Sequence, residues 1–232
     1  MTKRILLPLA VAALVCVLAG PWIFVKYVEG APDPLLKLPS ERHPATVGMD
    51  GTWVVVPGSG DAAQRSQAGY RADQALLWET VTVSGRTTGV TGSLTVVGGS
   101  LQSATFAVEV ASIQSPHHGR DNKFRSQDVM DTGKFATAQL KIADPVDLSA
   151  VPDDGAPASM QIAAALTLKG VTRQAAVRLD VQRSGDHVVV VGQIQLNFAD
   201  YNISPPSPPA GILQVQPIAS VEFLVNLAQQ PA

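Results

Sequence analysis

The chain of 232 residues contains a single cysteine, Cys16, which lies inside an apolar run near the N-terminus. The rest of the chain therefore cannot form an internal disulfide, bind zinc through thiolates or use a cysteine nucleophile, so its stability must come from a packed core. Charge is also scarce, at 16% of residues with a net charge of −2. There is no basic stripe with interleaved aromatic residues, which argues against a nucleic-acid partner.

Residues 5–25 form an uncharged run that is almost wholly apolar, and it follows Lys3 and Arg4. At about 1.5 Å per residue a helix of this length measures roughly 31 Å, enough to cross a bilayer once. The basic residues before it favour a cytoplasmic N-terminus, so we expect a cell-membrane protein whose bulk lies on the extracytoplasmic side. Cleavage after Ala19 is the alternative, but the apolar run continues through Val25, as in a retained signal anchor.

The sequence then divides into simple parts. Residues 1–4 form the expected cytoplasmic N-terminus, and residues 26–46 contain four prolines among polar residues. Prolines at that density favour extended, semi-rigid backbone, so this part is predicted to be a spacer. Residues 47–228 have the length of one domain, and residues 229–232 are a short tail.

Apolar and polar residues alternate strictly in the predicted domain, over residues 104–110, 162–168, 175–181, 188–198 and 219–227. Alternation over such lengths is typical of half-buried strands in an antiparallel sheet. Turn sequences rich in glycine, aspartate and serine separate the segments. We predict an all-β protein of eight to ten strands, a closed barrel or a sandwich, without a long helix outside the anchor.

The predicted inward faces contain few aromatic residues, which make up only 5% of the chain. An eight-stranded barrel is either filled by its side chains or holds one ligand. Small inward residues favour a cavity, whereas large neighbours could equally fill the space. If there is a cavity, the residues expected to line it are Ala104, Phe106, Val108, Phe124, Ala164, Leu166, Val190, Gly192, Ile194 and Phe198.

Charge is concentrated in residues 119–131, where six of thirteen residues are charged. This segment is either a solvated connection or a short helical lid over the barrel mouth. In a helix Asp121 and Arg125 are one turn apart and Asp128 lies three residues after Arg125, while Phe124 can turn inward. We expect these charged residues and Arg120 to have a structural role rather than to contact a lipid headgroup.

The same segment resembles the signature of the YceI-like family, roughly R-D-x-H-L-R-S-x-D-F-F-D, through Arg120, Asp121, Arg125, Ser126, Asp128 and Asp131. Residues 166–173 are similar to the family's L-T-x-x-G-V-T-[KR] block, and residues 198–203 to its D-[FY]-G-I element. There Asn202 replaces glycine, and asparagine is the non-glycine residue that best tolerates the same left-handed turn. Residues 58–75 are the part least typical of the family.

The resemblance implies a lipocalin-like barrel from the bacterial envelope that binds a polyisoprenoid lipid. Together with the apolar run it predicts a membrane-anchored lipid-binding protein that holds or transfers an isoprenoid-type lipid. The alternative is an envelope protein-interaction module with a filled core and no lipid. The sequence contains no nucleophile elbow and no histidine spacing suited to a metal, so we expect neither an enzyme nor a metal or other cofactor.

Overall fold

The computed structural model describes residues 31–230 apart from residues 59, 77–78 and 207–212. The predicted anchor at residues 5–25 and its alternative cleavage site lie outside the described residues. Within the described part of the chain, no helix combines the length and the apolar character that crossing a bilayer requires.

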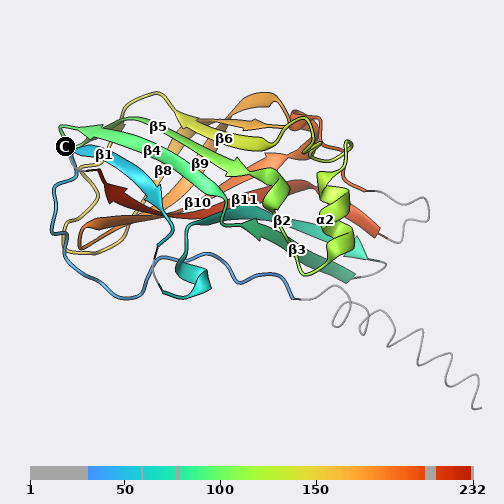
Figure 1. Ribbon diagram of the computed structural model, residues 1–232, viewed down its shortest axis with the longest axis horizontal. Helices are drawn as coiled ribbons and strands as arrows, with labels where there is room; N and C mark the ends of the chain where they lie inside the picture. Colours follow the sequence, from blue (N-terminus) through green and yellow to red (C-terminus); the bar gives the residue numbers. More distant parts are fainter. Residues whose placement is uncertain (1–30, 59, 77–78, 207–212, 231–232) are drawn as a thin grey trace, which may run out of the picture.

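The described chain consists of eleven strands, one short α-helix and three 3₁₀ turns (Figure 1). In chain order these are β1 (Gly51–Val56), η2 (Ala62–Gln64), β2 (Gln67–Leu76), β3 (Glu79–Thr87), β4 (Val90–Val97), β5 (Ser100–Glu109), η3 (Val110–Ser112), α2 (His118–Arg125), β6 (Thr137–Ile142), β7 (Val146–Asp147), β8 (Ala158–Leu168), β9 (Val171–Ser184), β10 (His187–Asn197), η4 (Phe198–Tyr201) and β11 (Leu213–Gln229).

Eight of these strands close into an antiparallel barrel. The ring runs β1-β4-β5-β6-β8-β9-β10-β11, and β11 pairs again with β1 to close it. The prediction of an antiparallel barrel of about eight strands is therefore confirmed. Strand β11 is long enough to pair with two strands along the same edge. Its N-terminal part pairs with β2, and its C-terminal part pairs with β1, where Gln229 is the partner of Trp53. The β2–β3 hairpin thus extends the wall beyond the ring on one side.

The barrel has two different ends. The mouth end carries α2, the β2–β3 hairpin and the β8–β9 turn, whereas the far end carries the C-terminus of β11 and the β4–β5 and β9–β10 turns (Figure 1). The half nearest the far end is buried from solvent, with Trp53, Val177 and Leu227 at most 1% exposed. The indole of Trp53 donates a hydrogen bond to the carbonyl of Met49, which satisfies its one polar group.

The predicted lid segment is helical over a shorter range than expected. Strand β5 ends at Glu109, η3 follows, and α2 covers only residues 118–125. The helix ends because Ser126 adopts extended backbone and its hydroxyl donates to the carbonyl of Lys123. The chain then folds back through hydrogen-bonded turns, in which Asp131 has a left-handed φ of 47°.

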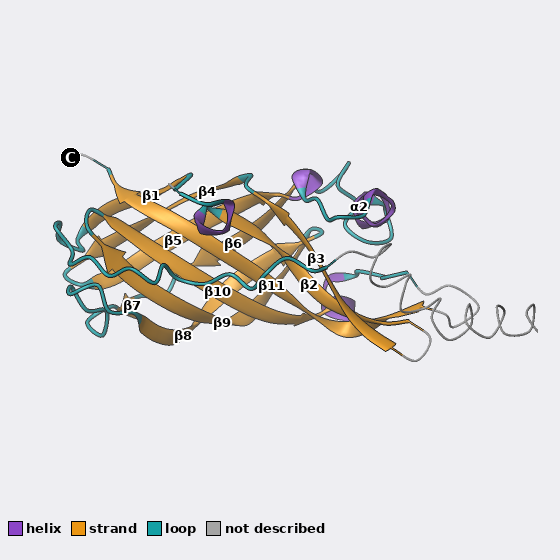
Figure 2. Ribbon diagram, turned by 90° about the horizontal axis from the view of Figure 1, so that it is seen from below, coloured by secondary structure: helices purple, strands orange, loops and turns teal. Residues whose placement is uncertain are grey.

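Residues 31–47, called the strap from here on, run along the outside of the barrel from the mouth end toward the far end (Figure 2). Near the mouth, the amide of Asp33 donates to the Ser84 hydroxyl over 2.8 Å. Near the far end, the amides of Ala45 and Thr46 donate to the carbonyls of Asp153 and Gly185. The described part of the expected spacer is therefore extended but is bound along the barrel, rather than leading away from it.

Candidate functional site

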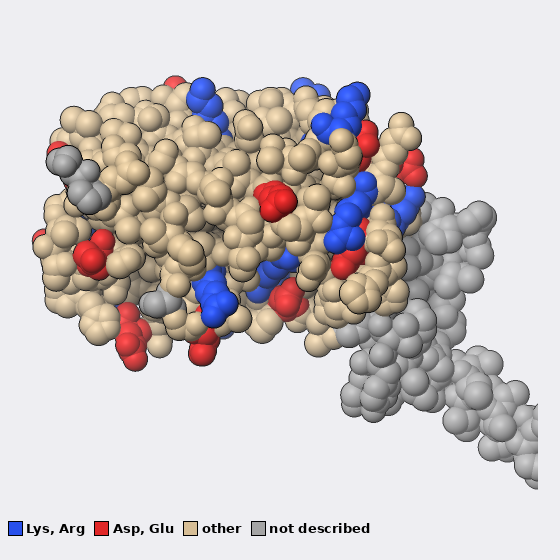
Figure 3. Space-filling view, viewed as in Figure 1, with Lys and Arg blue, Asp and Glu red and all other residues tan. Residues whose placement is uncertain are grey.

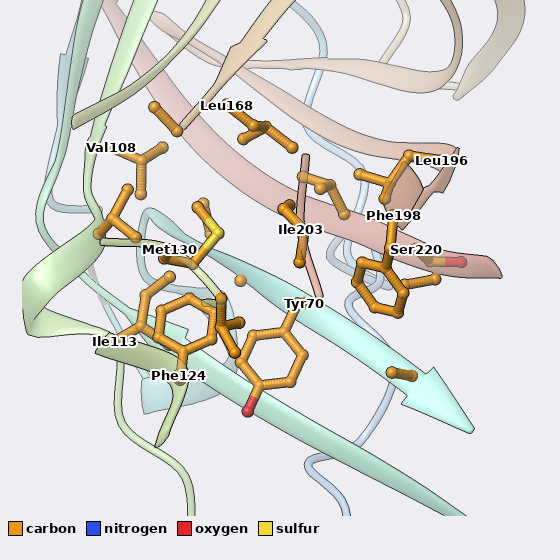
Figure 4. Close-up of a pocket in the computed structure, with 18 of the residues that line it drawn as sticks. Tyr70, Val108, Ile113, Phe124, Met130, Leu168, Leu196, Phe198, Ile203 and Ser220 are labelled. Atoms are coloured by element: carbon orange, nitrogen blue, oxygen red, sulfur yellow. The ribbon is translucent and has the colours of Figure 1, made fainter. Parts of the chain in front are cut away.

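A cavity of about 340 Å³ lies inside the barrel at the mouth end. Its walls come from the inward faces of β2, β5, β6, β8, β10 and β11, and α2 with the turns after it forms one side. The lining residues labelled in Figure 4 are nearly all apolar: Tyr70, Val108, Ile113, Phe124, Met130, Leu168, Leu196, Phe198, Ile203 and Ser220. The space lies within the range of ligand pockets and is far larger than the voids that close-packed interiors leave.

The α2 segment closes this cavity with an aromatic contact. The rings of Phe124 and Tyr70 stack with their centroids 5.0 Å apart and an interplanar angle of 11° (Figure 4). Met130, which follows the helix, is only 6% exposed and also lines the cavity. Burial raises the pKa of the Tyr70 hydroxyl to about 12. Phe124 itself lines the cavity.

The lid is fixed to the barrel by hydrogen bonds to separate partners. Asp121 is buried, and one of its oxygens accepts from both the amide and the hydroxyl of Ser115, at 2.9 and 2.7 Å. Arg125 donates to the carbonyls of Ala111 and Ile113, at 2.9 and 3.2 Å. These two charged residues therefore tie α2 to the chain that follows β5, which agrees with the structural role expected for them.

Asp128 and Lys169 connect the three segments that carry the family resemblance. The ammonium group of Lys169 donates to the carbonyls of Asp128 and Asn202, each over 2.8 Å. Asn202 adopts the predicted left-handed conformation, with φ of 55°. Ser204, two residues after Asn202, donates its amide to the same Asp128 carbonyl. The three motif blocks thus form one junction that holds the lid against the β8–β9 turn and the end of β10.

The mouth end also carries charged side chains. Lys123 of α2 forms an ion pair with Asp128 over 2.8 Å, and this hydrogen bond holds the pKa of the Asp128 carboxyl below its usual range. Arg120, His117 and Lys123 all contribute to the lining of the cavity. On the face shown in Figure 3, several Lys and Arg side chains gather at this end, and much of the remaining surface is uncharged.

The structure places most of the predicted cavity residues around this cavity. The larger cavity is lined by Phe106, Val108, Phe124, Leu166, Ile194 and Phe198. Ala104 and Val190 instead line a second cavity of about 70 Å³ toward the far end. The prediction did not separate the two spaces, because alternation gives the face of a residue but not its height in the barrel.

Ala164 and Gly192 line neither cavity, although both lie on the inward face. Gly192 pairs with Phe223, and a Cβ added to this glycine would lie 2.0 Å from the Phe223 ring. The expected space over Gly192 is therefore occupied by that ring, which also lies between the two cavities. Ala164 is 2% exposed and packed in the core.

Several site residues come from β2, the region least typical of the family. The cavity side of this strand carries Ala68, Tyr70, Ala72 and Gln74 at alternating positions. Gln74 is 5% exposed, and its side-chain nitrogen has no hydrogen-bond partner among the described residues. The period-two pattern of these residues was the available signal, although their small and polar side chains make it weak.

Solved structures similar to this fold include a polyisoprenoid binding domain from Saccharophagus degradans implicated in plant cell wall breakdown. It is 19% identical, with a TM-score of 0.54, and the match covers 71% of this chain and 98% of that one. BcnA from Burkholderia cenocepacia is 15% identical, with a TM-score of 0.53 over 68% of this chain and 95% of its own. At these identities the likeness shows a shared fold.

No curated protein sequence is significantly similar to this chain. The sequence does match the model of the YceI-like domain over residues 61–226, a range that contains the lid, the junction at Lys169 and nearly all of the barrel. This match covers more than half of the chain, and it includes the three motif blocks that the structure brings together. The chain belongs to the YceI-like domain family.

Proposed function

We propose that this protein binds an isoprenoid-type lipid in its barrel, while anchored to the cell membrane with the barrel on the extracytoplasmic side. The observation that carries the proposal is the apolar cavity of about 340 Å³ beneath a lid with an aromatic contact. The polyisoprenoid binding domain of similar fold supports this class of ligand. The family match supports lipid binding in the barrel as well.

The energetics favour an apolar chain in this space. Each buried CH₂ group contributes about 0.8 kcal/mol, so ten buried carbons would contribute about 8 kcal/mol before the costs of binding. The methyl branches of an isoprenoid suit a wall built from branched residues such as Val108, Leu166 and Ile194. The cavity also argues against the alternative of an interaction module with a filled core.

The buried side chain of Gln74 indicates what else the ligand carries. Its cross-strand neighbours Val81 and Val215 are apolar, and its nitrogen has no hydrogen-bond partner among the described residues. A buried donor without an acceptor costs about 1–3 kcal/mol, which a ligand oxygen would recover. We therefore propose an isoprenoid with a hydroxyl, carbonyl or phosphoryl oxygen. Gln74→Leu should weaken binding of a polyprenol but not of squalene, an isoprenoid hydrocarbon.

The membrane anchor is proposed from the sequence. Residues 5–25 are uncharged and long enough to cross a bilayer, and Lys3 and Arg4 precede them. An anchored barrel would remain next to the bilayer in which long-chain isoprenoids dissolve. N-terminal sequencing of the mature protein tests this, because a chain that begins at Gly20 would have lost its anchor.

Lipid binding is tested by titrating the full-length protein in detergent with a fluorescent polyprenol. Ala219→Phe places a ring in the cavity, because Ala219 lines it and is 5% exposed. Ala163→Phe is the matched control, because Ala163 is exposed on the outer face of β8. We expect Ala219→Phe to weaken binding at least tenfold and the control to leave it unchanged. Equal binding by both variants would place the ligand elsewhere, and no saturable binding would favour the interaction module.

A further inference from the structure

The strap is held to the mouth end by a buried ionic cluster. The Glu222 side chain is 5% exposed, and it pairs with Arg86 at 2.7 Å and with Arg71 at 3.3 Å. Each arginine also donates to the strap, Arg71 to the carbonyl of Asp33 over 2.7 Å and Arg86 to the carbonyl of Pro34. Ion pairs that are largely removed from water are strong and specific in geometry, so the cluster fixes where the strap begins.

This attachment lies on the wall of the larger cavity. Arg71 and Ser84 are register partners on β2 and β3, and both face outward to the strap. Their chain neighbours Tyr70, Ala72 and Val83 face inward and line the cavity. The N-terminal contacts of the strap therefore lie beside the mouth, and Figure 2 shows the strap running from there across the outside of the barrel.

The chain between this point and the apolar run is short. Seven residues, 26–32, separate Val25 from Asp33. Fully extended they span at most about 25 Å. The far end is more distant, because a strand of 14 residues such as β9, tilted as in other barrels, covers about 35 Å along the axis. If residues 5–25 span the membrane, this short connection holds the mouth within about 25 Å of the bilayer, whereas it lets the far end stand about 35 Å further away.

We propose that the strap orients the barrel so that its mouth faces the lipid bilayer, which makes the membrane surface the partner of the mouth end. This inference rests on the proposed anchor and gives the proposed ligand a direct route into the cavity. Leu35 of the strap and Ile218, paired with Asn197 at the end of β10, are 59% and 57% exposed at this end.

The test measures the height of each end of the barrel above the membrane. The full-length protein with Cys16→Ala is reconstituted in phosphatidylcholine vesicles that contain an acceptor-labelled lipid. One sample carries a donor dye on Ile218→Cys and another on Val97→Cys, a far-end position whose exposure of 59% matches that of Ile218. We expect energy transfer to place the Ile218 probe about 30 Å closer to the bilayer than the Val97 probe, from the strand length and tilt given above.

A flexible insertion separates the role of the strap from that of the anchor alone. Fifteen glycine and serine residues between Ala31 and Pro32 should remove most of the height difference, and the same insertion between Gly98 and Gly99 should leave it unchanged. Equal heights in the parent protein, or a lower far end, would overturn the inference, as would failure of the protein to remain in the vesicles. Absence of lipid in the barrel with the expected heights would instead refute only the proposed ligand.

Discussion

The stack between Phe124 and Tyr70 is the contact that a ligand must disturb if it leaves through the lid. An aromatic pair contributes about 0.5–1.5 kcal/mol beyond its buried area. The half-buried Phe124 ring adds about 1 kcal/mol of apolar contact. Phe124→Ser therefore removes about 2 kcal/mol from the closed lid, which corresponds to an off-rate about 30-fold faster.

The assay follows release of a fluorescent polyprenol from preloaded full-length protein in detergent, after addition of excess unlabelled polyprenol. Phe124→Leu is the control, because it retains apolar contact and loses only the stack, so its off-rate should rise about fivefold for a loss of about 1 kcal/mol. Thermal unfolding of each variant is measured beside the off-rate. If Phe124→Ser changes neither the off-rate nor the unfolding temperature, residues 118–131 are a solvated connection and not a lid.

Three further predictions follow from the contacts described. Gly192→Ala should push the Phe223 ring into the cavity, which lowers lipid occupancy with little loss of stability. A loss of about 1–3 kcal/mol in the free energy of urea unfolding would show instead that the ring has no room to move. The double variant Asp121→Arg with Arg125→Asp exchanges the two charges. It should lower the thermal unfolding temperature strongly, because each residue has its own backbone partner. A near-normal unfolding temperature would contradict this explanation. Burial raises the pKa of Tyr70 to about 12, so its contribution to stability should be complete below pH ~10, the unfolded value, and be lost progressively as the pH rises toward about 12. Tyr70→Phe should therefore flatten the fall in unfolding free energy between about pH 10 and 12.

The barrel could be predicted because its inward residues repeat every second position. Strands β5, β8, β9, β10 and β11 contain nearly all residues of the five alternating segments. Alternation alone did not show that the Phe223 ring fills the space beside Gly192, because that depends on pairing between two strands. Local pattern thus identified the wall but not how neighbouring strands fill the interior.

The lid was predicted in part. Its charge concentration and the position of Phe124 were visible in the sequence, but the partners of Asp121 and Arg125 lie up to fourteen residues away along the chain. The strap was missed because proline-rich sequence gives extended backbone whether or not it is bound to a surface. Its attachment depends on Glu222, which is almost two hundred residues away in the sequence and appeared only as a polar position in an alternating strand.

The most direct test of the central proposal is native mass spectrometry with lipid extraction of the full-length protein, purified in mild detergent from its own host. We expect one isoprenoid lipid with an oxygen-bearing end per barrel, and we expect its loss in Ala219→Phe but not in Ala163→Phe. A barrel that carries no lipid, or that carries membrane phospholipid in the same amount in both variants, would contradict the proposal.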